Sequence, residues 1–275
     1  MATIGAHLSM AGGHAKAVER AVDIGCNALQ VFSASPKGWN FARLTDAEIE
    51  LFRTTKKRLG VDPVYFHASY LVNFADTNRI GPLSVQLITH ELKLASKMGV
   101  RGSIIHLGSF KTNGNGMEHL CENIKKTLDK IPDDVCFIIE NAGNRKIGLR
   151  LEEIGEIIKT VSDPRVRVCL DTCHLHAAGY DLSGEEAFNR FLEEFDRLVG
   201  IDLVELWHIN DSKDPFESFR DRHENLGYGT VGQEVFSNII NNPRTKHHPF
   251  IIETPGMDGL GPDQINVDIL KGYIE

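Results

Sequence analysis

Residues 166–182 read VRVCLDTCHLHAAGYDL, an apolar run that ends in a carboxylate and is followed by an imidazole. The run predicts a buried strand over 166–171, with Asp171 as its last residue. An unpaired carboxylate in a core costs several kcal/mol or becomes protonated. Asp171 and His174 therefore either satisfy neighbouring polar groups or bind a positively charged partner.

The same unit, an apolar run followed by an amphipathic stretch, repeats along the chain. Strands are predicted at 3–8, 28–34, 63–68, 102–107, 136–141, 166–171, 203–209 and 249–254. Stretches with helical periodicity lie between them, among others at 14–25, 45–59, 82–98 and 184–199. Eight β-α units in 275 residues predict an α/β fold, a single (β/α)8 TIM barrel with 1–275 as one domain. A doubly wound open sheet is the alternative, but no G-x-G-x-x-G motif follows the first strand.

Local signals place several helix ends. Thr45 and Glu48 form a capping-box pattern, and Ser183 precedes an acidic helix start. Gly99 and Gly200 stand where the preceding helices are expected to stop.

The composition, 41% hydrophobic and 25% charged, is typical of a globular protein. No apolar run is long enough to span a membrane and no secretory signal is evident, so we expect a cytoplasmic protein. The five cysteines form no C-x-x-C pair, and we expect reduced thiols, with Cys169 and Cys173 packing in the core. The net charge of −8 argues mildly against a nucleic-acid partner, although bound metal ions would change the local charge.

Six consecutive predicted strands, the third to the eighth, carry an imidazole or a carboxylate as their last or next-to-last residue. These residues are His67, His106, Glu140, Asp171, His208 and Glu253. In a TIM barrel the C-terminal ends of the strands form the face on which active sites are built. Groups of this kind would repel or desolvate one another there without cations between them. The set predicts a metal site, whereas any single member alone would be an ordinary hydrogen-bonded residue.

Two further segments extend this set. His174 follows Asp171 by three residues, so an extended chain would point the two side chains to opposite faces, and we expect a turn there. The long segment 210–232 contains Asp221 and His223, whose spacing puts both side chains on one side of an extended chain. Five histidines and four carboxylates favour zinc, with manganese possible at a carboxylate-rich position. Nine ligands suit three ions if one carboxylate bridges.

The other histidines fall into two groups. Surface positions are expected for His14, His90, His119, His247 and His248. His7, at the end of the first strand, is instead expected to hydrogen-bond a metal ligand and orient it.

Six motifs spread over the whole chain carry a family resemblance. They are GAHLSMAGG (5–13), FHASYLVN (66–73), CLDTCHLHAAGYD (169–181), HINDSK (208–213), DRHENLGYG (221–229) and IIET (251–254). Together they resemble endonuclease IV, a family of trinuclear-zinc apurinic/apyrimidinic endonucleases with a xylose-isomerase-like TIM barrel. The resemblance implies a first zinc held by His67, His106 and Glu140, a second held by Glu140 as a bridge with Asp171, His208 and Glu253, and a third held by His174, Asp221 and His223.

The resemblance also implies a DNA repair enzyme that acts on double-stranded DNA containing abasic sites. It would hydrolyse the phosphodiester 5′ of the abasic site, leave 3′-hydroxyl and 5′-deoxyribose phosphate ends, and clean blocked 3′ ends. The catalytic candidates are Glu140 and Glu253, and the candidates for DNA contact are Lys37, Tyr70, Leu71 and Arg222. No obligate protein partner is evident, and in a prokaryote the enzyme would work in the cytoplasm, at damage in the nucleoid.

The chain departs from the family pattern in two loops. The residues after Glu140 read NAGNRKIG, where the family usually has Asn-Thr-Ala-Gly and a Gln-Gly pair. Lys37 stands where some relatives have Arg, which keeps the charge but removes a planar guanidinium. Both departures affect expected DNA contacts and leave the expected metal ligands in place.

Two other functions remain open. A sugar isomerase or epimerase on a similar barrel would use Glu140, Asp171, His208 and Glu253 but would not need the other five ligands. A non-catalytic protein could use the ions structurally, although closed, Cys-rich ligation is more typical of that use. Metal stoichiometry and activity on abasic DNA separate these possibilities.

Overall fold

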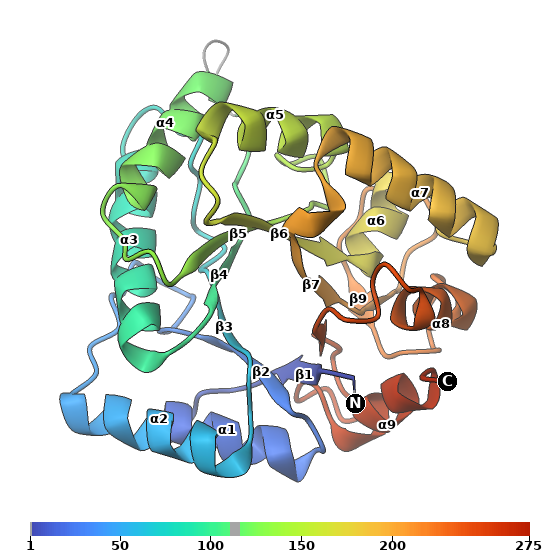
Figure 1. Cartoon of the computed structure of the whole chain (residues 1–275), viewed down its shortest axis with the longest axis horizontal. Helices are drawn as coiled ribbons and strands as arrows, with labels where there is room; N and C mark the ends of the chain where they lie inside the picture. Colours follow the sequence, from blue (N-terminus) through green and yellow to red (C-terminus); the bar gives the residue numbers. More distant parts are fainter. Residues whose placement is uncertain (1, 111–115) are drawn as a thin grey trace.

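The computed structural model describes residues 2–110 and 116–275. Within them, parallel strands close a barrel with neighbours in the order β1-β10-β7-β6-β5-β4-β3-β2 (Figure 1). The barrel strands are β1 (Ile4–His7), β2 (Ala28–Phe32), β3 (Val64–His67), β4 (Gly102–Ile105), β5 (Cys136–Glu140), β6 (Val166–Asp171), β7 (Val204–His208) and β10 (Phe250–Ile252). A short antiparallel pair, β8 (Asp211–Ser212) and β9 (His223–Glu224), forms a separate sheet. The barrel confirms the predicted fold class, and every predicted strand has a counterpart in it.

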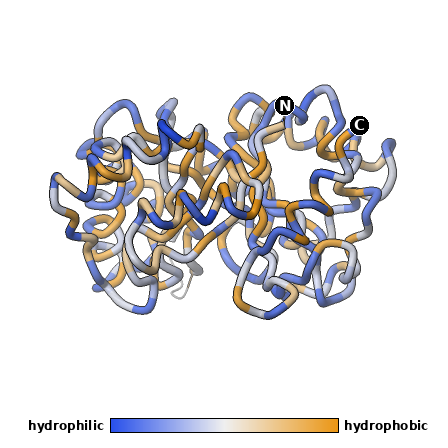
Figure 2. Tube along the Cα trace, turned by 90° about the horizontal axis from the view of Figure 1, so that it is seen from below, coloured by the Kyte–Doolittle hydropathy of each residue, from blue (hydrophilic) through white to orange (hydrophobic). Residues whose placement is uncertain are grey.

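Helices surround the barrel on the outside (Figure 1). They are α1 (His14–Asp23), α2 (Asp46–Leu59), α3 (Ile80–Met98), α4 (Gly116–Leu128), α5 (Leu151–Val161), α6 (Thr172–Ala178), α7 (Gly184–Leu198), α8 (Gln233–Asn241) and α9 (Gln264–Gly272), with a 3-10 turn, η1, at Ile201–Leu203. In a side view, hydrophobic segments gather in the middle of the molecule (Figure 2). Across the described residues, every helix is too short or too polar to cross a membrane.

The expected helix ends are present. Thr45 caps α2 in a capping box, because its Oγ1 accepts from the Glu48 N–H at 3.3 Å and its own N–H donates to the Glu48 carboxylate at 2.7 Å. Gly99 follows α3 with φ 66°, a left-handed conformation that glycine adopts without strain. Helix α7 begins after Ser183 as expected, although the Ser183 hydroxyl donates to Asp181 at 2.5 Å instead of capping the helix.

Two apolar layers hold this architecture together. The larger cluster joins strands to helices and includes Phe52, Phe66 and Phe236. The smaller cluster fills the barrel and consists of Ala28, Tyr65, Ile104, Cys136, Ile138, Cys169, Leu206 and Ile251. Inward-facing side chains of a TIM barrel stack in such layers, so the barrel is a packed core rather than a channel.

Two histidines that were expected at the surface are buried. His14 is 4% exposed, its ring packs edge-on against Phe52, and its Nε2 lies 3.3 Å from the carbonyl oxygen of Phe32. His248 is 7% exposed, and its Nδ1 accepts a hydrogen bond from the indole N–H of Trp207 at 3.3 Å. The surface expectation was wrong for both, because their partners come from distant parts of the sequence.

Candidate metal centre

A layer of donor side chains lies directly above the apolar interior of the barrel. Side chains alternate along a strand, so the residue two positions after an interior one also points inward. Glu140 follows Ile138 by two residues in β5, and His208 follows Leu206 in the same way in β7. The same two-residue spacing from an interior side chain brings together all six predicted strand-end residues, which are His67, His106, Glu140, Asp171, His208 and Glu253.

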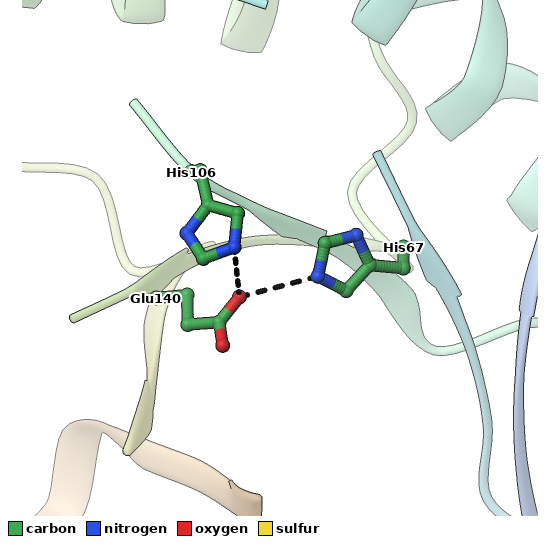
Figure 3. A group of neighbouring side chains, drawn as sticks. All are labelled: His67, His106 and Glu140. Atoms are coloured by element: carbon green, nitrogen blue, oxygen red, sulfur yellow. Dashed lines mark hydrogen bonds and ion pairs between the residues drawn. The ribbon is translucent and has the colours of Figure 1, made fainter. Parts of the chain in front are cut away.

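His67, His106 and Glu140 form the first donor group (Figure 3). The Nε2 atom of each imidazole lies 3.2 Å from Oε2 of Glu140. His67 and Glu140 end β3 and β5, and His106 stands one residue past β4, which pairs with both strands. The group therefore arises from three neighbouring strands.

Glu140 also belongs to a second donor group. The Nδ1 atom of His208 lies 3.0 Å from Oε1 of Glu140, 3.7 Å from Oδ2 of Asp171 and 3.4 Å from Oε2 of Glu253. The donor atoms of these four residues lie within 4.8 Å of one another. Glu140 thus turns one carboxylate oxygen toward each group, the arrangement expected of a bridging ligand.

His174 reaches the site because the chain turns into α6 directly after Asp171. Asp171 is the N-cap residue of α6, and its Oδ1 accepts a hydrogen bond from the His174 N–H at 2.9 Å. The expected turn between these two residues is thereby confirmed. Gly143, in the loop after β5, allows this close packing, because a Cβ there would lie 2.8 Å from the Cα of His174.

Asp221 lies between His174 and His223. Its Oδ1 is 3.0 Å from Nε2 of His174 and 3.5 Å from Nε2 of His223. Both nitrogens are buried and have no hydrogen bond of acceptable geometry to any described residue. Buried polar atoms are normally satisfied, and neutral imidazole is the commonest metal ligand in proteins. The residues present therefore fit a bound metal ion.

Burial and charge oppose each other throughout the centre. Burial favours protonated Glu140 and Glu253, but the surrounding imidazoles outweigh it and hold both pKa values well below the ordinary range. Burial lowers the pKa of His106 to about 4. Burial also disfavours the charged forms of His174 and His208, yet the nearby acidic groups raise both pKa values well above the ordinary one. The ionised carboxylates are thus stabilised by positive charge on the imidazoles. A divalent cation would take the place of the imidazole protons.

Glu253 is held by two residues, only one of which was expected from the sequence. His7, at the end of β1, has Nδ1 2.9 Å from Oε1 of Glu253, as the expected orienting role requires. Gln30 of β2 was missed: its Nε2 donates to the same oxygen at 2.5 Å, and its Oε1 lies 2.8 Å from Nε2 of His208. The available signal was a polar residue inside an otherwise apolar strand.

Two buried asparagines were missed as well. Asn210 donates through Nδ2 to Oδ2 of Asp171 at 2.6 Å, and its Oδ1 accepts from the N–H of Glu253 at 2.7 Å. Asn141 accepts the N–H of Asp171 through Oδ1 at 2.7 Å, and its carbonyl oxygen lies 3.0 Å from Nδ1 of His174. Asn141 is the last residue of one predicted strand, and Asn210 directly follows another. Such partners fix the orientation of a metal ligand.

Tyr70 and Leu71 lie beside the first donor group. They line a pocket of about 360 Å³ that His106 also borders. Tyr70 is 58% exposed. An aromatic ring and an aliphatic side chain are therefore available next to the donor groups.

The two candidate phosphate contacts differ in their surroundings. Lys37 is exposed in the loop after β2. Arg222 donates to Asp214 through Nε at 2.6 Å and through Nη2 at 2.5 Å. No pattern in the sequence indicated this pairing.

All five cysteines are buried and free, as the packing expectation requires. Cys169 lies near the second donor group, and Cys173 lies near Asp221 and His223. Burial raises the pKa of the Cys169 thiol to about 12 and also raises that of Cys173. Both side chains are fully enclosed in the core, where the expected packing role places them.

Comparisons with known proteins agree with this geometry. Residues 18–271 match the family model described as xylose isomerase-like TIM barrel. The chain is 37% identical over 274 residues to the probable endonuclease 4 of Halothermothrix orenii, covering 98% of this chain and 99% of that protein. It is 38% identical over 264 residues to the probable endonuclease 4 of Methanosphaerula palustris, covering 93% and 92%.

Solved structures also resemble this chain. The crystal structure of endonuclease IV from Thermus thermophilus superposes with a TM-score of 0.88 at 34% identity, over 98% of each chain. A D-tagatose 3-epimerase-like protein superposes with a TM-score of 0.71 at 18% identity, over 99% of this chain and 97% of that one, which shows a shared fold alone. With this barrel, these donor groups and full-length relatives above 30% identity, the chain is a member of the endonuclease IV family, nucleases built on the xylose isomerase-like TIM barrel.

Proposed function

We propose that this protein is a zinc-dependent DNA repair endonuclease that hydrolyses the phosphodiester immediately 5′ of an abasic site in duplex DNA. Its family membership supports endonuclease activity. The observation that carries the proposal is the donor set around Asp221, where two buried imidazole nitrogens lie 3.0 and 3.5 Å from one carboxylate oxygen. A barrel that uses one ion has no need of this set.

Three ions would be held by the groups described above. His67, His106 and Glu140 would hold the first, Glu140, Asp171, His208 and Glu253 the second, and His174, Asp221 and His223 the third. Nitrogen and oxygen donors favour zinc, with manganese as an alternative at a carboxylate-rich position. Bound divalent ions would polarise the phosphate and lower the pKa of water towards about 7.

Glu253 would orient the attacking water or accept its proton. Hydrogen bonds from His7 and Gln30 fix its Oε1, and its Oε2 lies 3.4 Å from Nδ1 of His208. Its pKa, held well below the ordinary range, keeps it ionised and able to orient water at neutral pH. Glu140 would bridge the first two donor groups and hold them at a fixed separation.

Residues around the site would recognise the damaged duplex. Tyr70 and Leu71 would enter the helix at the abasic site, where flipping is least costly because a base is already missing. Lys37 and Arg222 would contact phosphates. Cleavage on the 5′ side would leave a 3′-hydroxyl and a 5′-deoxyribose phosphate, and the same reaction at a blocked 3′ end would clean it. The barrel of residues 1–275 would act as one domain.

One experiment tests this function. A labelled duplex with a single tetrahydrofuran abasic analogue is incubated with the zinc-loaded protein, with and without a chelator. We expect one nick, 5′ of the analogue, that the chelator abolishes, and no nick in an undamaged duplex of the same sequence. Absence of nicking by protein that holds its zinc would overturn the proposal.

A second candidate function rests on one specific observation. Glu140, Asp171, His208 and Glu253 form a compact four-donor group that by itself suits a single-ion sugar isomerase or epimerase. That function would leave His174, Asp221 and His223 without a role. A reproducible content of one metal ion, unchanged in His174→Ala, together with turnover of a ketose would favour it.

A further inference from the structure

The ligand candidate Asp221 lies in a long excursion between β8 and β9, and the ligand candidate His223 follows it as the first residue of β9. We call residues 213–222 the arm. At its base, Ser212 of β8 pairs with His223 of β9, and the Lys213 N–H donates to the carbonyl oxygen of Arg222 at 3.0 Å. At its tip, the N–H groups of Glu217 and Phe219 donate at 3.0 Å to carbonyl oxygens at the end of α6. The returning stretch that carries Asp221 lies between these two attachments.

A bidentate ion pair within the arm holds this stretch as well. Arg222 donates through Nε and Nη2 to the two carboxylate oxygens of Asp214, at 2.6 and 2.5 Å. Asp214 is 3% exposed, and its carbonyl oxygen accepts hydrogen bonds from the hydroxyls of Ser212 and Thr230. The Arg222 guanidinium therefore binds a carboxylate of a residue that is itself hydrogen-bonded in place. A two-point contact fixes the orientation of the guanidinium as well as its distance from the carboxylate.

The position of Arg222 in the sequence links this ion pair to the orientation of the two ligand candidates. Arg222 lies between Asp221 and His223, and successive side chains of an extended segment point to opposite sides. When Arg222 turns to Asp214, its two neighbours turn the other way. There Asp221 lies 3.0 Å from Nε2 of His174, and His223 lies 3.7 Å from Oδ2 of Asp171.

We propose that the Asp214–Arg222 pair is a clasp that positions Asp221 and His223 for metal binding, which makes both members of the clasp positioning residues. This proposal rests on the third metal site of the proposed function. It gives Arg222 the primary role of fixing the arm, although the Arg222 side chain is 56% exposed and can still lie near a phosphate. Arg220 is a natural control, because it belongs to the same arm but is 67% exposed and lies 3.5 Å from Asp214.

The test is the release of zinc from the full, zinc-loaded chain to a chromogenic chelator. The zinc equivalent that is missing in His174→Ala is the ion of the third site, to which the arm contributes Asp221. We expect Arg222→Gln and Asp214→Asn to speed release of that equivalent by about 10- to 100-fold, the range typical for residues that orient a metal ligand. The other equivalents and Arg220→Gln should follow the wild type. The double variant should be no faster than the faster single variant, because one interaction is lost only once.

Arg222→Lys refines the test. Lysine keeps the charge but cannot form the two-point contact, so its release rate should lie between those of wild type and Arg222→Gln. Thermal unfolding of each variant identifies a general loss of stability. Wild-type release rates in Arg222→Gln and Asp214→Asn, equal acceleration of all equivalents, or no equivalent sensitive to His174→Ala would each overturn the clasp.

Nicking of abasic duplex by the wild type is measured in parallel. Selective zinc loss in the variants together with an inactive wild type would retain the clasp and reject the proposed function. An active wild type together with unchanged zinc release in the variants would retain the proposed function and reject the clasp.

Discussion

The imidazole of His7 hydrogen-bonds to the carboxylate of Glu253, with Nδ1 2.9 Å from Oε1. Gln30 donates to the same oxygen at 2.5 Å. Two side chains from the first two strands thus hold a carboxylate that follows the last strand of the barrel. The other oxygen of Glu253, Oε2, is turned toward His208 at 3.4 Å. One carboxylate is therefore oriented by neighbours on one side and available for metal or water chemistry on the other.

Glu253→Gln tests the chemical role of this carboxylate. Glutamine is nearly isosteric but has no negative charge and cannot accept a proton at neutral pH. We expect the variant to keep most of its zinc and to bind abasic duplex, yet to cut at least about 100-fold more slowly, at the low end of general-base contributions. Single-turnover cleavage is compared with zinc content and DNA affinity on one preparation, with exposed Glu50→Gln on α2 as the control. Near wild-type cleavage would remove Glu253 from the chemistry, and loss of zinc would make it mainly a ligand.

Metal content is the second prediction. The nine donors should hold close to three zinc equivalents per chain, and His174→Ala should lower the content by about one while the other two remain. Elemental analysis after gel filtration measures this directly. His119→Ala, which removes an exposed imidazole on α4, should have no effect. A wild-type value of one would contradict a trinuclear centre.

Tyr70→Ala should weaken binding to abasic duplex without changing zinc content. An aromatic side chain that stacks on bases contributes about 1–3 kcal/mol, and Tyr70 is exposed beside the donor groups without belonging to them. Fluorescence anisotropy with an abasic and an undamaged duplex measures the loss. Leu51→Ala, which trims an exposed apolar residue on α2, is the control. Equal abasic-duplex affinity of Tyr70→Ala and wild type would exclude this role.

Lys37→Ala should reduce the salt dependence of DNA binding. Each lysine that neutralises a phosphate releases a condensed counterion, so losing one such contact lowers the slope of log K against log salt by about one unit. Titrations between low and moderate salt give the slope. Lys57→Ala, at an exposed position in the last turn of α2 near Gly60, provides a matched charge control. A slope that does not change would place Lys37 away from the phosphates.

His248 should make stability depend on pH. Burial, together with the nearby His247, lowers its pKa from 6.5 to about 4 in the folded protein. The unfolded chain therefore binds a proton first, so stability present above pH 6.5 is lost as the pH falls from 6.5 to about 4. Protonation also disrupts acceptance of the Trp207 N–H at Nδ1.

Relative to His248→Gln, which keeps an acceptor but does not titrate, the wild type should lose up to roughly 3 kcal/mol of unfolding free energy between about pH 7 and 4. Urea unfolding at several pH values measures this difference. A difference that stays constant with pH would show that His248 is not held neutral.

The sequence alone determined the barrel and the direction of its strand-end side chains. Apolar runs that alternate with amphipathic stretches require parallel β-α units, and the period-two alternation of a strand points Glu140 inward once Ile138 does so. Both are local properties, readable from neighbouring residues. The turn after Asp171 was predictable for the same reason, because three residues on an extended chain cannot present both Asp171 and His174 to one site.

Only the tertiary structure decided which residues support those ligands. Gln30 meets Glu253 across 223 residues of sequence, and His14 and His248 are buried by partners that no local pattern reveals. The pairing of Asp214 with Arg222 spans only eight residues, yet it depends on how the arm folds back on itself. Such contacts arise when closure of the barrel brings separate loops to one face. A sequence therefore shows which side chains point into the site, whereas the closed fold decides which of them hold the others in place.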